Sequence, residues 1–145
     1  MIAIIIALLM APSLGMLAMN GNVDWAGRIG LALVFAFTGF GHFAKTDAMA
    51  EMLPESIPGR RALILASGIF ELLLAMLLLA WPKSRLLGMT IIGFLIAIFP
   101  ANVYAAFQRI PFGGHSAGPI YLLVRAPLQL LLIFWTYWFE VRVEG

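Results

Sequence analysis

The sequence contains no cysteine and little charge. Of its 145 residues, 11% are Asp, Glu, Lys or Arg. The absence of cysteine excludes disulfide bonds, thiolate metal ligands and a thiol redox relay. The formal net charge of +2 comes from scattered residues and forms no basic patch, which argues against nucleic-acid binding. By contrast, 63% of the residues are hydrophobic, a fraction typical of membrane proteins rather than soluble ones.

The hydrophobic residues fall into long, nearly uncharged segments. A helix that spans a bilayer needs about 20 apolar residues, so four or five spans would use nearly the whole chain. We therefore predict one integral membrane domain over residues 1–145, folded as an all-α, multi-pass helical bundle. The predicted spans cover about residues 2–19, 25–44, 61–81, 86–108 and 120–139.

The first of these segments has two interpretations. It carries no charge before Asp24, so it is either a retained helix or a secretory signal peptide. A signal peptide has a basic residue before its apolar run and a small-residue cleavage site after it. Here the basic residue is missing, and Pro12 and Gly15 lie inside the run. We expect a retained N-terminal helix that is additional to a four-helix core.

The connections between the later segments predict the topology. Because successive spans alternate in direction, the long loop 46–59 and the turn-rich connector 111–119 should lie on one side of the membrane. The basic residues divide equally between the two sides, so the positive-inside rule does not settle orientation. The short turn with Lys83 and Arg85 favours the cytoplasmic side. Pro100 should break and bend its helix near Phe99.

Four polar side chains, one from each of the four later predicted spans, lie near one depth in the bilayer. A charge inside a spanning helix costs about 2.5 to 3.5 kcal/mol, which makes Glu71 and Arg125 conspicuous. Counted along their helices, these two residues, Asn102 and His42 lie roughly 5 to 15 Å from the same membrane surface. Four helices therefore each contribute one polar group to the same half of the bilayer.

Helical spacing places further polar residues on the same faces. Tyr121 and Gln129 share a face with Arg125, so we predict an intramembrane pocket for the polar head of a ligand. Its candidate binding residues are His42, Glu71, Asn102, Tyr121, Arg125 and Gln129.

The alternative to a ligand site is architectural. Glu71 and Arg125 would then be an ion pair that fixes helix register, and in either case we expect them to touch directly or through one water. Asn102 would be an interhelical hydrogen-bonding group, and His42 a wet interfacial residue. His115, in the connector, is expected to be exposed.

The sequence offers little support for other kinds of site. Two histidines, one of them in a loop, do not provide a metal site, so no metal is expected. The glycine-rich segment 38–42 lies within an apolar span without a preceding strand, which indicates helix packing rather than nucleotide binding. No residue is assigned a catalytic role.

Four segments together resemble the DoxX-like family of small bacterial membrane proteins. They are FTGFGHF at 37–43, GIFEL at 68–72, FPANVY at 99–104 and RAPLQ at 125–129. The resemblance covers about residues 28–138 and implies a four-helix core in a bacterial cytoplasmic (inner) membrane. It places His42, Glu71, Asn102 and Arg125 on the family's motif positions. The family takes its name from a subunit associated with thiosulfate:quinone oxidoreduction.

The resemblance and the polar residues together suggest the function. We expect an accessory or ligand-binding subunit linked to membrane redox processes, without catalytic activity of its own. Its partner would be a redox enzyme or a second copy of the chain, and its ligand a quinone or a lipid. One alternative is a quinone-reactive oxidoreductase subunit, in which Glu71 or His42 exchanges protons and Arg125 polarises a quinone carbonyl. Another is a small-solute transporter with a hinge at Pro100.

Overall fold

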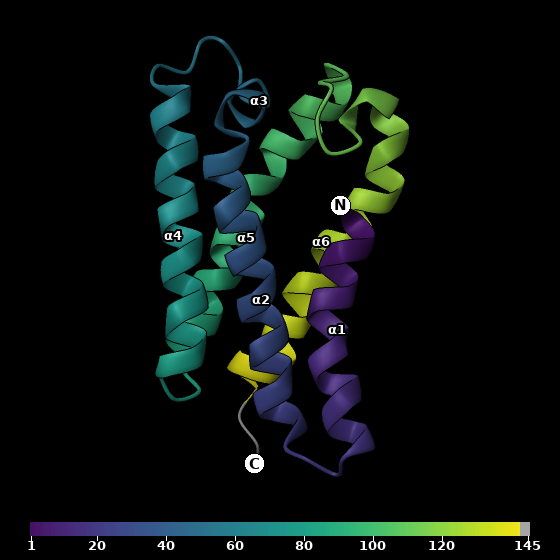
Figure 1. Cartoon of the computed structure of the whole chain (residues 1–145). Coiled ribbons are helices and arrows are strands. Elements are labelled where there is room, and N and C mark those ends of the chain that lie inside the picture. The colour runs from purple at the N-terminus through teal and green to yellow at the C-terminus, as the bar shows by residue number, and fades with distance from the viewer. Residues whose placement is uncertain (143–145) are drawn as a thin grey trace.

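The computed structural model describes residues 1–142, which form helices and no strand (Figure 1). This confirms the predicted all-α bundle, including the additional N-terminal helix. The α-helices are α1 (Ile2–Ala18), α2 (Val23–Ala44), α3 (Thr46–Ala50), α4 (Arg60–Ala80), α5 (Arg85–Phe107) and α6 (Leu122–Thr136). Two 3₁₀ turns, η1 (His115–Ala117) and η2 (Pro119–Tyr121), precede α6, and a π-helical turn, η3 (Tyr137–Val141), follows it.

Four helical segments are long and apolar enough to cross a membrane. They are α2, α4, α5 and the continuous stretch Pro119–Val141 that contains α6. The chain is therefore a multi-pass membrane protein. α1, with 17 residues, is apolar but shorter than these four.

The helices begin where the sequence supplies caps. The side chain of Asn22 accepts a hydrogen bond from the backbone N–H of Trp25 at 3.0 Å, which satisfies one free donor at the start of α2. Gly59, before α4, has a φ of 69°, a conformation that glycine adopts at little cost. These residues separate the apolar runs into distinct helices.

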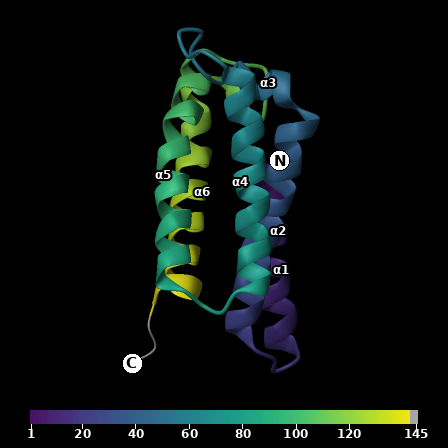
Figure 2. The same cartoon turned by 90° about the vertical axis from the view of Figure 1, so that its left-hand side faces the viewer.

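The long helices associate as two pairs. α2 packs against α4, and α5 packs against α6, as Figure 2 shows. Gly39 and Gly68 permit the close approach of α2 and α4, because a Cβ atom on Gly68 would lie 2.7 Å from the Cβ of His42. α1 packs along α2, where a Cβ on Gly30 would lie 2.2 Å from the carbonyl oxygen of Leu9.

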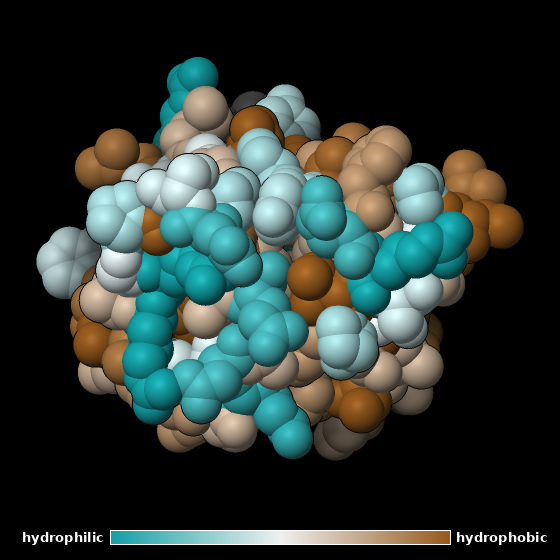
Figure 3. Space-filling view, turned by 90° about the horizontal axis from the view of Figure 1, so that it is seen from above, coloured by the Kyte–Doolittle hydropathy of each residue, from teal (hydrophilic) through white to brown (hydrophobic). Residues whose placement is uncertain are grey.

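The predicted topology agrees with the structure. The loop that contains α3 and the connector before α6 lie at the same end of the bundle, at the top of Figure 1. Seen from above in Figure 3, hydrophilic side chains gather over this end and hydrophobic ones lie around its rim. We call it the loop end.

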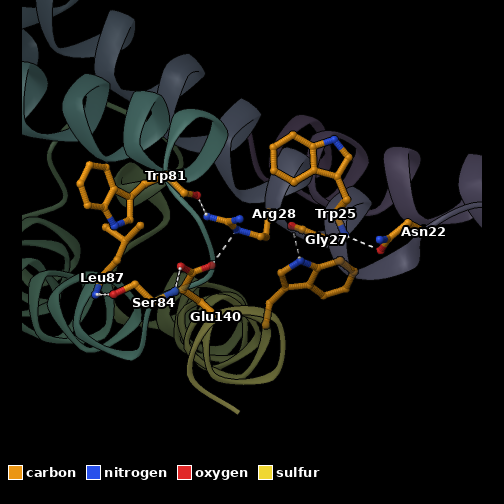
Figure 4. Close-up of polar contacts among 9 residues, drawn as sticks. Asn22, Trp25, Gly27, Arg28, Trp81, Ser84, Leu87 and Glu140 are labelled. Carbon is orange, nitrogen blue, oxygen red and sulfur yellow. Dashed lines mark hydrogen bonds and ion pairs between the residues drawn. The ribbon is translucent and has the colours of Figure 1, made fainter. Parts of the chain in front are cut away.

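The opposite end is held by a buried ion pair that the sequence analysis missed. Arg28 Nε of α2 lies 2.8 Å from Glu140 Oε2 of η3, and Arg28 Nη2 donates to the carbonyl oxygen of Trp81 at 2.6 Å (Figure 4). The other carboxylate oxygen of Glu140 accepts from the backbone N–H of Ser84 at 2.9 Å. These contacts join the two helix pairs at the end remote from the loops.

The predicted break at Pro100 does not interrupt the helix, because α5 is continuous from Arg85 to Phe107. The predicted bend stays a prediction. Pro100 has no N–H, so it removes only the hydrogen bond to the carbonyl of Ile96, four residues earlier. The turn around it remains bonded, and the Asn102 side chain donates to the carbonyl oxygen of Ile98 at 3.2 Å. A single proline in a lipid-facing stretch of a long helix is tolerated without an interruption.

Candidate functional site

A cavity of about 320 Å³ lies between the two helix pairs, in the half of the bundle nearest the loop end. Its wall is mainly apolar and is formed by residues of α1, α2, α4, α5 and α6, together with α3 and its following loop and the connector. The polar side chains that line it are Thr38, His42, Ser67, Glu71, Asn102, His115, Tyr121 and Arg125. The packed helix pairs and the loops at the loop end line this partly open space.

The structure brings together all the candidate residues from the sequence except Gln129. His42, Glu71, Asn102, Tyr121 and Arg125 line the cavity. Gln129 lies one turn deeper than Arg125 and donates a hydrogen bond to the carbonyl oxygen of Leu95. This contact joins α6 to α5 outside the cavity lining.

His42 and Glu71 form a pair between α2 and α4. His42 Nε2 lies 3.5 Å from Glu71 Oε1, and both side chains are largely buried. His42 Nδ1 lies 2.8 Å from the carbonyl oxygen of Ile64. A carbonyl oxygen only accepts, so Nδ1 carries the hydrogen, and Nε2 is a bare acceptor when the ring is neutral. An attractive contact with Glu71 then requires one proton on the pair, either on Nε2 or on the carboxyl group.

Arg125 meets Asn102 rather than Glu71. Its Nε donates to Asn102 Oδ1 at 3.0 Å, which connects α6 to α5. The predicted direct contact between Glu71 and Arg125 is wrong, because each has a partner within its own helix pair. Contact through one water stays a prediction. Sequence depth places the two at one level but does not say that a cavity separates them.

His115 is the site residue that the sequence analysis missed. It was expected to be exposed, but it is fully buried and its ring lies edge-on to Tyr121, with 4.8 Å between ring centroids. Its Nδ1 lies 2.6 Å from the carbonyl oxygen of Phe112. Gly113 and Gly114 have φ values of 62° and 102°, and this glycine-permitted turn folds the histidine inward. The Gly-Gly dipeptide before His115 was the available signal.

The environment of His115 keeps its ring neutral. Burial lowers the pKa of His115 below its usual value of 6.5, and the nearby positive charge of Arg125 acts in the same direction. The hydrogen bond with the Phe112 carbonyl opposes this shift without overcoming it. Because Nδ1 faces that carbonyl, the neutral ring presents Nε2 as a hydrogen-bond acceptor.

Four buried polar atoms on the cavity residues have no hydrogen-bond partner among residues 1–142. They are Glu71 Oε2, His115 Nε2, Tyr121 Oη and Arg125 Nη1. Leaving a buried polar group unpaired costs about 1 to 3 kcal/mol, and more for a charged group. Together they offer a cationic donor, a hydroxyl and two acceptors to a molecule in the cavity. Within the described part of the chain, no three acidic or histidine side chains cluster as metal ligands.

One comparison with known proteins gives a match. The model of a family described as Domain of unknown function (DUF8561) matches residues 31–140. The matched region includes the pairs His42–Glu71 and Asn102–Arg125 and leaves out α1. No curated protein and no solved structure matches the chain.

Proposed function

The chain belongs to the family described as Domain of unknown function (DUF8561), and we propose that it binds a small amphipathic molecule in its intramembrane cavity. The observation that carries this proposal is the set of four unpartnered buried polar atoms around one mainly apolar space. A ligand with a polar head and an apolar body would satisfy those atoms and fill the rest of the cavity.

In the cell, this binding would serve an accessory subunit of a membrane redox system. The support is the resemblance of four motifs to the DoxX-like family, whose motif positions include His42, Glu71, Asn102 and Arg125. The same resemblance favours a bacterial cytoplasmic membrane as the location. The partner would be a redox enzyme or a second copy of the chain.

The ligand can be sought in the purified protein. After extraction from cell membranes in a mild detergent, organic extraction and mass spectrometry should identify a stoichiometric small molecule. Ala101→Phe places a large side chain on the cavity wall and should remove that molecule. Gly93→Phe is the matched control, because a Cβ there has nothing within 4 Å and Gly93 does not line the cavity. Equal recovery from both variants would contradict the proposal.

The second candidate is a quinone-reactive subunit, favoured by the contact between His42 and Glu71 beside the cavity. A quinone takes up protons when it is reduced, and this pair would supply one while Arg125 donates a hydrogen bond to a carbonyl oxygen. Electrons would come from a partner protein. Recovery of quinone as the bound molecule would favour this candidate.

A further inference from the structure

The charge balance of the cavity depends on five titratable side chains. They are His42 from α2, Glu71 from α4, His115 from the connector, Tyr121 from η2 and Arg125 from α6. α1 and α3 contribute apolar side chains to the lining, and α5 contributes Asn102 as its only polar one. Among the lining side chains, any net charge must therefore come from these five groups.

The charges of four of these groups, His42, Glu71, His115 and Tyr121, sum to zero. The geometry fits one proton between His42 and Glu71, and the pair is then neutral whether it is imidazolium with carboxylate or imidazole with carboxylic acid. His115 is buried with Nδ1 on the Phe112 carbonyl, which fits a neutral ring. Tyr121 is a neutral phenol in the ordinary pH range.

The remaining group, Arg125, leaves one positive charge. Among the described residues, its hydrogen-bond partner is the neutral amide of Asn102, and its Nη1 is buried without a partner. A guanidinium stays charged under all ordinary conditions, and an uncompensated charge within a membrane is costly. An anion at Nη1 would remove this cost.

We infer that the cavity's ligand is an amphipathic monoanion, with a carboxylate head on Arg125 and a short hydrocarbon chain along the apolar wall. This inference rests on the proposed function and specifies its ligand class. Guanidinium and carboxylate form strong, charge-assisted hydrogen bonds, and one oxygen can also accept from the Tyr121 hydroxyl. The apolar lining, with residues such as Ile5, Leu128 and Leu132, suits a hydrocarbon chain rather than a second polar group.

Octanoate, 1-octanol and octylammonium are suitable probes because they differ mainly in the charge of the head. Isothermal titration calorimetry would use the full chain in phosphatidylcholine nanodiscs, with empty nanodiscs subtracted for partitioning into lipid. Octanoate should bind about tenfold or more tightly than 1-octanol, and octylammonium should bind weakest. Equal affinity for octanoate and octanol would overturn the inference.

Substitutions of Arg125 test the role of its charge. Arg125→Gln should abolish the preference for octanoate over octanol, whereas Arg125→Lys, which keeps the charge, should retain it. Arg85→Gln is the matched control, because Arg85 is exposed at the end remote from the cavity. A preference that persists in Arg125→Gln would overturn the assignment. Should that variant fail to fold, the comparison of Arg125→Lys with the unaltered chain still tests it, since loss of preference in the lysine variant contradicts a charge-based site.

Glu71→Gln gives a second test, because it keeps a hydrogen-bonding group beside His42 Nε2 but cannot carry a negative charge. The octanoate affinity of this variant should stay close to that of the unaltered chain. If Glu71 instead carried a bare charge that balances Arg125, Glu71→Gln would raise octanoate affinity about tenfold or more, which would overturn the inference.

The outcomes separate the ligand class from the proposed function. If octanol binds as tightly as octanoate and Ala101→Phe weakens the binding of both, the anionic ligand class is contradicted and the amphipathic pocket is supported. Binding of none of the three probes would overturn the anion as well, and the molecule extracted with the unaltered protein and with Ala101→Phe then decides the proposed function separately.

Discussion

His42 and Glu71 are coupled in the structure, whereas Glu71 and Arg125 are not in direct contact. When two side chains stabilise each other, replacing both should cost less than the sum of the two single losses. Double-mutant cycles of thermal unfolding in detergent should give a coupling of about 1 kcal/mol or more for His42→Gln with Glu71→Gln. The cycle of Glu71→Gln with Arg125→Gln should give a smaller value. The reverse ranking would contradict the pairing seen here.

His115 should make stability depend on pH. Its pKa is lowered in the folded state, so the unfolded chain binds a proton first as the pH falls through about 6.5. Stability is therefore fully present above that pH and declines below it. The melting temperature should fall between about pH 7.5 and pH 5.5, and His115→Asn, which keeps a donor near the Phe112 carbonyl, should show a smaller fall. An equal fall in both proteins would exclude His115 as the cause.

At single residues, the sequence predicts which polar groups share a level but not which of them touch. Helix length and alternation place His42, Glu71, Asn102 and Arg125 in one half of the bilayer, because rise per residue is fixed. Partner choice depends on the separation of the helix pairs, which a single sequence does not encode in a readable pattern. The inward turn of His115 depends on tertiary packing of a loop and was missed for the same reason.

The two helix pairs are joined at the remote end by the Arg28–Glu140 ion pair, which links α2 to η3. Both side chains are buried, with 7% and 0% exposure. Removing one partner leaves an unpaired buried charge, so Glu140→Gln should cost about 3 kcal/mol or more in the free energy of unfolding. Replacing both, as in Arg28→Met with Glu140→Met, should recover part of this loss. Additive losses, measured by unfolding in detergent, would contradict the ion pair.

The helices themselves were largely predictable. The bounds of the long helical segments lie within about two residues of the sequence-based ranges. Residues such as Asn22, Gly59 and Ser84 cap or turn the chain directly before the apolar runs and so mark where the helices begin. Two features were not predictable from periodicity. The continuity of α5 through Pro100 and the π-helical turn η3 both depend on neighbouring contacts that satisfy the backbone.

The whole molecule is a bundle of two helix pairs, which are joined by the Arg28–Glu140 ion pair at one end and line a cavity toward the other. This arrangement requires the α3 loop and the connector to lie on one side of the membrane. Because the sequence has no cysteine, single cysteines can be introduced without background. Ala48→Cys and Ser116→Cys should react with an impermeant maleimide from the same side, and Lys83→Cys from the other. Labelling of Ala48→Cys and Ser116→Cys from opposite sides would contradict the topology.

A high-resolution experimental map of protein purified from cell membranes would show whether the cavity holds the polar head of a ligand on Arg125. We expect non-protein density in the cavity, about 3 Å from Arg125 Nη1, with His42 still paired to Glu71. A collapsed cavity in which Arg125 contacts Glu71 directly would contradict it.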